Sequence, residues 1–306
     1  MKGKQVGYVM GILMMLIVIT YLGLKMVVEN EAETHIRQWA EQTGMLTDFS
    51  YDRLEVGLID RTARVSRVSF RIRNTNSPIA VDELILHAFD IQHEIPFFMH
   101  VEMKGIRIGQ SHPFLQGAAP LLNQLGYGDI TANLIYAYRF DSIKKYMEIE
   151  KIDIQISDAG RLQLTARLNN LDPAVIRSVP NNPFMLISAV SAVAISGMTV
   201  HFEDHSLTRR LVQWGARQSG QSEEAFLSGI TQQLKLEIQK QQPPAAKERL
   251  QAIAHFLEKP GIIELAVSPA EPIPIMQLVM AGSAGQWIDL LNITVSHDHR
   301  HSRWLD

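Results

Sequence analysis

Cysteine is absent from this chain of 306 residues. Disulfide bonds therefore cannot form, and the disulfide-dense secreted scaffolds are excluded, although a cysteine-free chain is compatible with export to a bacterial periplasm. The sequence also lacks a nucleophile elbow, a P-loop and a dinucleotide-binding fingerprint. We therefore expect no enzymatic activity and no cofactor, with a hydrolase as the remaining catalytic alternative.

Positive charge is scarce outside the first 28 residues. Without Lys2, Lys4 and Lys25, the chain has 26 basic and 32 acidic side chains and a formal net charge of −6. Binding of nucleic acid needs a basic stripe that neutralises phosphates, so nucleic acid is not an expected partner. The length beyond residue 28 is sufficient for one large domain or two ordinary ones.

The beginning of the chain contains a long apolar run. No charged residue occurs from Val6 through Leu16 to Leu24, and about 19 residues at about 1.5 Å each cross a hydrocarbon core about 30 Å thick. Lysines precede the run and acidic residues follow it, which predicts a cytoplasmic N-terminus. Residues 1–28 are thus predicted to be the cytoplasmic tip and transmembrane signal anchor of a bacterial inner-membrane protein. The bulk of the chain would then be periplasmic, with the phospholipid bilayer as a partner.

Two other interpretations of this run remain open. A cleaved signal peptide has an apolar region of about 7 to 15 residues and a small-residue cleavage site, whereas this run is longer and lacks an A-x-A pattern. A buried core helix is the third interpretation.

The rest of the chain predicts an α+β fold, in which curved antiparallel β-sheets accompany a helical subdomain. Residues 29–46 are compatible with a helical stalk, and residues 47–170 form a β-rich region of alternating apolar and polar positions. Residues 171–260 include three helical segments between positions 206 and 258. Residues 261–306 return to strands before a histidine-containing tail.

Several strands change phase internally. Met99, Val101 and Met103 are apolar at odd positions, whereas Ile106 and Ile108 are apolar at even positions. A change of phase by one residue within a strand indicates a β-bulge or a sheet with both faces partly covered. Because curved sheets often need bulges, this pattern favours a curved sheet.

The clearest β signal lies between residues 130 and 170. Its three strands are joined by links too short for crossovers, which predicts an antiparallel meander. Large apolar side chains occupy the inward positions of this meander and form a predicted face for an apolar ligand. The residues of this face are Leu134, Tyr136, Tyr138, Phe140, Leu162 and Leu164.

The C-terminal tail is a candidate metal site. His297, His299 and His301 alternate, and an extended strand would bring their three imidazoles to one side, a geometry that binds zinc, copper or nickel. Solvated histidines in a terminal tail are the simpler interpretation.

Two other polar clusters have ordinary interpretations. The HFEDH motif does not match the spacing of zinc-binding helices, so Asp204 and Ser206 are expected to cap the following helix. Arg67, Arg71 and Arg73 share the outward face of one strand. They are suited to contact phospholipid head groups or acidic partners, or to form a charged solvent face that protects a sheet edge.

A family resemblance follows from two segments. The meander sequence LGYGDITANLIYAYRFDSIKKYMEIEKIDIQISDAGRLQLTARLNN resembles periplasm-facing proteobacterial proteins with a single N-terminal anchor. The anchor followed by YDRLEVGLIDRTARVSRVSFRI is similar to the opening of AsmA-like proteins of the bacterial envelope. The resemblance covers roughly residues 1–170. It implies a curved β groove with an apolar inner surface and a role in lipid traffic or outer-membrane homeostasis.

Two functional hypotheses result. The first is a membrane-anchored, non-enzymatic periplasmic factor that binds lipid or another apolar ligand on its concave sheet. The second is a structural or scaffold subunit whose helices recruit protein partners in an envelope or secretion complex.

Overall fold

The computed structural model describes most of the chain from residue 46 onward. The described ranges are 46–57, 62–72, 75, 77–90, 92–93, 96–113, 115–172, 191–240, 243–281 and 284–298. The predicted anchor and nearly all of the predicted stalk lie outside these ranges, as do His299, His301 and Arg73.

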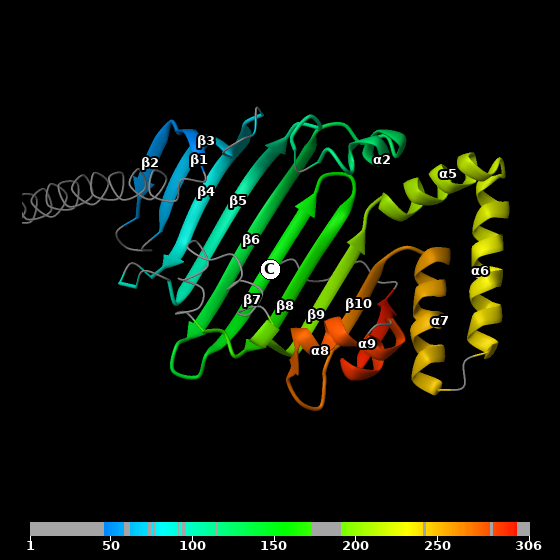
Figure 1. The fold of residues 1–306 in the computed structure, drawn as a ribbon. Helices are drawn as coiled ribbons and strands as arrows, with labels where there is room; N and C mark the ends of the chain where they lie inside the picture. Colours follow the sequence, from blue (N-terminus) through cyan, green and yellow to red (C-terminus); the bar gives the residue numbers. More distant parts are fainter. Residues whose placement is uncertain are drawn as a thin grey trace, which may run out of the picture.

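The described strands form one sheet in which all neighbours are antiparallel (Figure 1). The strands are β1 (Leu46–Ser50), β2 (Arg53–Val56), β3 (Ala63–Ile72), β4 (Ile79–Phe89), β5 (Phe98–Ile108), β6 (Ile130–Asp141), β7 (Tyr146–Ile156), β8 (Gly160–Asn169), β9 (Ala194–Asp204), β10 (Ile262–Val267), β11 (Ile273–Pro274) and β12 (Ile293–Asp298). Their spatial order is β1-β3-β4-β5-β6-β7-β8-β9-β10-β12, with β2 beside β3 and β11 beside β9. From β3 to β10 the order in space therefore follows the order in the chain.

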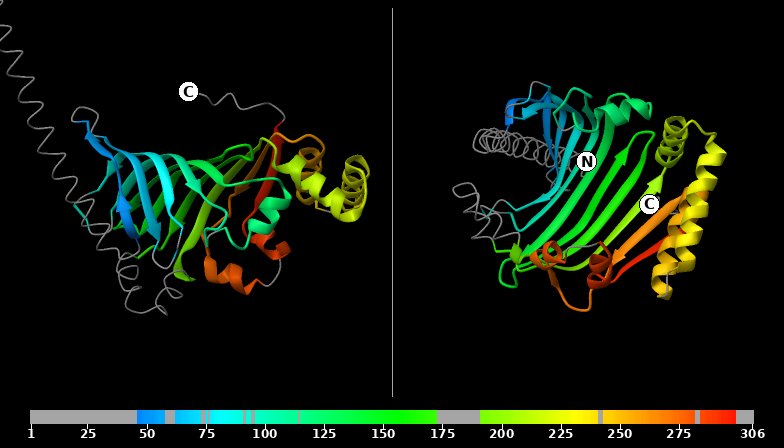
Figure 2. Two further views of the ribbon diagram at one scale, coloured as in Figure 1. Left: turned by 90° about the horizontal axis from the view of Figure 1, so that it is seen from above. Right: turned by 45° about the vertical axis from the view of Figure 1, so that its right-hand side comes forward.

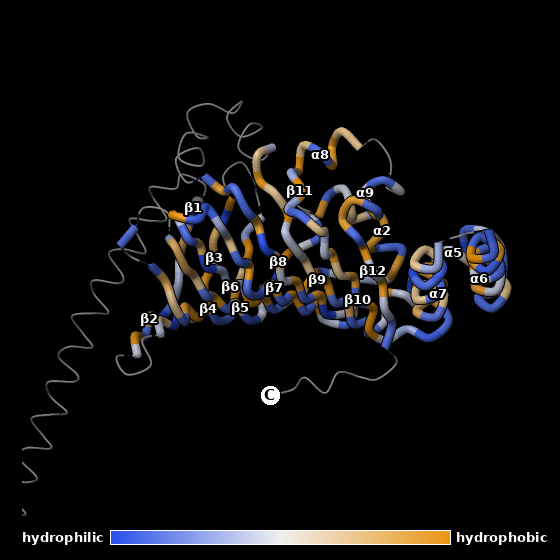
Figure 3. Tube along the Cα trace, turned by 90° about the horizontal axis from the view of Figure 1, so that it is seen from below, coloured by the Kyte–Doolittle hydropathy of each residue, from blue (hydrophilic) through white to orange (hydrophobic). Residues whose placement is uncertain are grey.

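The described helices gather toward the C-terminal half of the sheet. They are α2 (Ala119–Gln124), α5 (Leu207–Ser219), α6 (Glu223–Lys240), α7 (Pro244–Glu258), α8 (Ile275–Met280) and α9 (Ala284–Leu290). Helices α5 to α7 extend beyond β10 and β12, while α8 and α9 lie to one side of the sheet (Figures 1 and 3). The views in Figure 2 show that the sheet is twisted and curved, as strand sterics require of a wide sheet.

Two arginines of α5 donate hydrogen bonds to backbone carbonyl oxygens at the end of α2. The guanidinium of Arg210 donates to the carbonyl oxygens of Leu125 and Gly126, at 3.0 and 2.9 Å, and lies 4.2 Å from the centre of the Tyr127 ring. Arg217 donates to the carbonyl oxygen of Gln124 at 2.9 Å. These carbonyls end a helix and have no partner within it, so the two arginines satisfy them and fix the direction of α5.

Bulges interrupt the ladder where the sequence predicts changes of phase. The pairing of β5 with β6 shifts by one residue between Met103 and Ile106, where Gly105 has a φ of 61°. The pairing of β7 with β8 shifts between Ile149 and Ile152. The bulge predicted in β5 is therefore confirmed, and β7 contains a bulge of the same kind.

Strand β3 also changes phase, between Val65 and Val68, but it does so differently. Arg67 has a φ of 50°, yet the register of β3 against β4 is the same on both sides of it. The change of phase in β3 is therefore a local kink without an inserted residue. Such a backbone conformation is uncommon outside glycine.

The predicted fold class is wrong as a whole. It combined a transmembrane helix with several curved sheets, whereas the described strands belong to one continuous sheet. Within the described ranges, no helix has both the length and the apolar character needed to cross a bilayer. The segment that carries that prediction, with Val6, Leu16 and Leu24, lies outside those ranges.

Candidate functional site

The sheet separates its side chains into two chemically distinct faces. Tyr136 of β6 lies opposite Val101 of β5 and Ile152 of β7. The paired positions can be followed from strand to strand in both directions. They form a row that crosses the sheet with one residue per strand, and every residue of the row is apolar. That row is Val56, Ala63, Leu86, Val101, Tyr136, Ile152, Leu164, Val200, Leu265 and Val295.

A second row runs beside the first. It also holds an apolar side chain at every strand until it ends at a histidine on β12. Its members are Leu54, Val65, Leu84, Met103, Leu134, Ile154, Leu162, Phe202, Ile263 and His297. We call the surface formed by these two rows and their same-face neighbours the apolar face.

The structure brings all six predicted ligand-face residues to the apolar face. Leu134 and Leu162 both lie opposite Ile154, and Tyr136 and Leu164 both lie opposite Ile152. Tyr138 and Phe140 belong to two further rows, where they pair with Ile149 and Met147 of β7. Sequence reasoning did not assign the contributions of β5, β7, β9 and β10 to this face, although their alternation could have revealed them.

The aromatic side chains of the apolar face are packed against one another and partly shielded from water. The rings of Tyr136 and Tyr138 are 5.5 Å apart, and burial raises the pKa of both phenols. The Tyr138 hydroxyl donates to the carbonyl oxygen of Pro96 at 2.9 Å. Phe140 is buried and meets the edge of Phe97, with ring centres 5.7 Å apart. This part of the face is therefore half-buried and rich in aromatic surface.

The described helices cover only one end of the apolar face. Helix α7 packs on β12 and β10, and its Phe256 lies 6.2 Å from the Phe202 ring and 5.9 Å from the His297 ring. Helix α6 packs between α5 and α7, and α8 packs at β11. In the described part of the chain, no helix packs extensively across β4 to β8. The tube in Figure 3 shows apolar and polar residues alternating along these strands.

The opposite face of the sheet carries ion pairs. Glu83 of β4 accepts from Arg64 at 3.2 Å and from Lys104 at 3.1 Å. Glu102 contacts His87 at 3.0 Å and Lys104 at 3.5 Å. These partners come from neighbouring strands, so the ion pairs act across the ladder and keep this charged face in contact with solvent.

Asp153 is the most enclosed acid of the charged face, at 4% exposure. Its carboxylate accepts from Arg161 at 2.8 and 2.7 Å and from Gln163 at 3.1 Å, with Lys151 at 3.5 Å. Burial favours the neutral acid, but these hydrogen bonds and cations outweigh it and lower the pKa of Asp153. The group is thus an ionised structural anchor.

The candidate metal site is only partly described. His297 lies on β12 opposite Ile263, and its Nε2 is 3.1 Å from the carbonyl oxygen of Lys259. The other two histidines of the tail fall outside the described ranges. Among the residues that the structure does describe, no group of three His, Asp, Glu or Cys side chains is arranged to bind a metal ion.

The HFEDH segment is divided between a strand and a helix cap. His201 of β9 pairs with Glu264 of β10 at 3.3 Å. Asp204 accepts from the backbone N–H of Thr208 at 2.8 Å, so the predicted capping role of Asp204 is confirmed. Ser206 occupies the predicted N-cap position of α5, but its side chain makes no capping hydrogen bond. Its hydroxyl donates instead to the carbonyl oxygen of Asp158.

The strand arginines pair with acids of their own chain. Arg67 forms an ion pair with Asp52, and Arg71 with Asp48 at 2.8 Å. Both acids lie in the edge segment that pairs with β3. The two cations therefore help to hold this edge in place.

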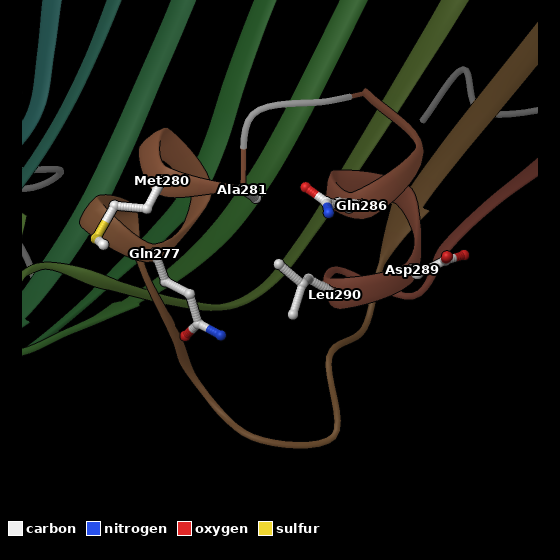
Figure 4. Close-up of a pocket in the computed structure, with 6 residues that line it drawn as sticks. All are labelled: Gln277, Met280, Ala281, Gln286, Asp289 and Leu290. Atoms are coloured by element: carbon white, nitrogen blue, oxygen red, sulfur yellow. The ribbon is translucent and has the colours of Figure 1, made fainter.

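A pocket of about 590 Å³ lies between α8 and α9, apart from the two apolar rows (Figure 4). It is lined by Gln277, Met280, Ala281, Gln286, Asp289 and Leu290. Gln277 and Leu290 face the space between the two helices. No prediction from the sequence falls on this pocket.

A family model described only as "Uncharacterized protein" matches residues 153–298. The matched region begins within β7 and ends with β12, so it takes in α5 to α9 but less than half of the chain. The comparison with curated proteins gives no match.

Proposed function

We propose that this protein is a non-enzymatic factor of the bacterial envelope that binds a lipid or a similar apolar ligand on the apolar face. The observation that carries the proposal is that both rows are apolar without interruption from β2 to β10. One row starts at Leu54 and the other at Val56. A sheet with one apolar face must bury that face against something. In the described ranges the helices do so only at the β12 end.

The dimensions of the apolar face suit an acyl chain. Neighbouring strands are about 4.8 Å apart, so a row crossing six strands is about 24 Å long. One leaflet of a bilayer has a hydrocarbon depth of about 15 Å, half of the full core. A complete acyl chain can therefore lie along one row, and the resemblance to AsmA-like envelope proteins supports the same ligand class.

Native mass spectrometry of the full chain, purified gently from membranes and then extracted for lipid, tests the proposal. We expect a stoichiometric lipid adduct that is lost on extraction. A clean mass of the unliganded chain under the same conditions would contradict the proposal.

Photocrosslinking locates the ligand. A photoreactive amino acid in place of Tyr136 or Leu164 should crosslink to lipid, because both side chains lie on the apolar face. The matched control is the same amino acid at Thr165, the exposed neighbour of Leu164 on the opposite face. Equal crosslinking at positions 164 and 165 would indicate nonspecific contact with lipid.

A scaffold function is the second candidate, favoured by apolar residues that α5 and α6 leave in solvent. Leu236 is 52% exposed and Leu211 is 38% exposed. If these helices recruit a protein partner, the double variant Leu211→Glu with Leu236→Glu should lose its copurifying partner and keep its bound lipid. Unchanged complexes in that variant would remove this candidate.

A further inference from the structure

The segment from residue 272 to residue 288 contains no charged side chain, although its apolar residues are exposed. It contains β11, α8 and most of α9. Met280 is 78% exposed, Val279 67%, Trp287 46% and Met276 40%. We call these four side chains the α8–α9 patch. A cluster of exposed large apolar side chains on adjacent short helices indicates an interaction surface.

Polar groups within the patch have partners inside the protein. The Trp287 indole N–H donates to the carbonyl oxygen of Leu278 at 2.5 Å. The N–H of Ala281 donates to Gln277 and Leu278 at the end of α8, and the N–H of Ile275 donates to the carbonyl oxygen of Val193. Moving the patch out of water would therefore leave few unpaired hydrogen-bonding groups, which keeps the cost of desolvation low.

The patch is continuous with the apolar face. Ile273 of β11 lies opposite Ile195 of β9, which in turn lies opposite Leu168 of β8. Leu168 continues the row through Met147 to Phe140. Helix α8 begins two residues after Ile273, so one apolar path leads from the sheet directly into the patch.

We propose that the α8–α9 patch inserts into the surface of a lipid bilayer. A protein partner would normally be recognised by about one hydrogen bond per 100 to 200 Å² of interface. The only hydrogen-bonding group among the four side chains of the patch is the Trp287 indole N–H, which already donates to Leu278. Met, Val and Trp are instead suited to the boundary between head groups and acyl chains. This inference does not require that the sheet itself binds lipid.

The charges around the patch define which bilayer it prefers. Glu271 precedes the uncharged segment and Asp289 follows it, with no lysine or arginine between them. The segment that carries the patch therefore supplies no cation to attract anionic lipid. We expect insertion into neutral phosphatidylcholine vesicles, with no gain from added anionic lipid and little dependence on salt.

The absence of cysteine allows a local test on the full chain. Single variants Val279→Cys and Met280→Cys, labelled with an environment-sensitive fluorophore, are mixed with phosphatidylcholine vesicles that carry a lipid-attached quencher. The matched control is Ile143→Cys, because Ile143 is 93% exposed in the turn between β6 and β7. Each label reports its own surroundings, so the result does not depend on which other part of the chain touches the vesicle.

If the patch inserts to a depth of about 5 to 10 Å, the emission of the fluorophores at positions 279 and 280 should shift to the blue. The lipid-attached quencher should remove roughly half of that emission. The label at position 143 should remain aqueous. A label at position 276, in the variant Met276→Cys, then reports insertion with and without the double substitution V279D and M280D. The double substitution should lower the inserted fraction about tenfold.

Two results would overturn the inference. One is an aqueous spectrum at positions 279 and 280 while the protein is bound to vesicles. The other is a blue shift without vesicles that grows with protein concentration, which would mean that a second copy covers the patch. Neither result would bear on lipid bound to the sheet, which mass spectrometry measures separately.

Discussion

The two faces of the sheet are built from the same strands but are held together by different forces. On one face, side chains such as Tyr136, Ile152 and Leu164 meet across the ladder through apolar contact. On the other, Asp153 is held by Arg161 through paired hydrogen bonds at 2.8 and 2.7 Å. Neighbouring residues of one strand therefore experience opposite environments.

This difference explains why the bulges matter. The side-chain period of a strand is two, so a slip of one residue would exchange the faces. At Gly105 and between Ile149 and Ile152 the sequence itself slips, and the bulge restores the original face. The bulges are thus the feature that keeps an apolar face continuous over strands whose sequences are out of phase.

The largest expected effect comes from a charge placed on the apolar face. Leu164→Asp puts a carboxylate between Ile152 and Val200, where the register supplies no cation. We expect the free energy of unfolding to fall by about 3 kcal/mol, measured by urea denaturation after removal of lipid. Thr165→Asp, one residue away on the exposed face, should change it by less than about 0.5 kcal/mol. Similar losses in both variants would mean that the two faces do not differ in burial.

A smaller effect is expected from the centre of the charged face. Asp153→Asn removes a carboxylate that accepts charged hydrogen bonds from Arg161 and should cost about 2 kcal/mol at pH 7. Because the pKa of Asp153 lies below its ordinary value of 3.8, the unfolded chain takes up this proton first as the pH falls. The stabilisation that the Asp153 carboxylate provides is therefore complete when the pH is above the ordinary value of 3.8. It is lost as the pH falls through the lower pKa of Asp153 in the folded protein.

Urea midpoints of the wild type and Asp153→Asn at pH 7 and near pH 3 measure this effect. The gap between the two proteins should narrow at the lower pH. Glu148→Gln is the control, since its partner Arg167 is 3.4 Å away and well exposed, and it should shift the midpoint little. A gap that is the same at both pH values would show that the carboxylate's charge contributes nothing.

The smallest effect concerns the bulge in β5. Gly105→Ala places a Cβ on a residue whose φ is 61°, and that atom would meet the Asp82 side chain. The Asp82 side chain can turn aside, so the expected loss is about 1 kcal/mol from the left-handed backbone alone. Gly128→Ala has open space and no such φ, and its denaturation midpoint should match the wild type. A neutral Gly105→Ala would mean that this bulge is not under backbone constraint.

Much of the strand pattern could be predicted from the sequence. The meander of β6 to β8 and the helices α5, α6 and α7 were predicted from periodicity and are confirmed. These elements are long or strongly alternating, so the hydrophobic pattern identifies them reliably.

Short or interrupted elements could not be predicted in this way. Strand β1 has five residues and a positive φ at Asp48, which breaks its alternation. Helices α8 and α9 are six and seven residues long, too short to establish a helical period. The start of β9 at Ala194 could not be predicted either, because the partners of Ala194 and Ile195 on β8 and β11 are remote in sequence.

The candidate site was predicted in part. Alternation in β6 and β8 gave six residues of the apolar face, but only the register reveals that Val200 and Leu265 extend the same row. The strands form one sheet only because β8 pairs with β9, although residues 170–193 separate these two strands in the sequence. Local sequence patterns do not encode such a pairing.

The pairing of each strand with its successor has a consequence for synthesis. From β3 to β9, every new strand can dock on one that has already left the ribosome, so assembly can proceed from the N-terminal side without waiting for later sequence. Growth of the sheet then ends at β12, where α7 packs beside the last strand and Arg249 donates to the carbonyl oxygen of Ile293 at 3.1 Å. Helix α7 thus packs beside the edge strand β12, and a variant from which α7 is deleted would leave that edge open to strand addition.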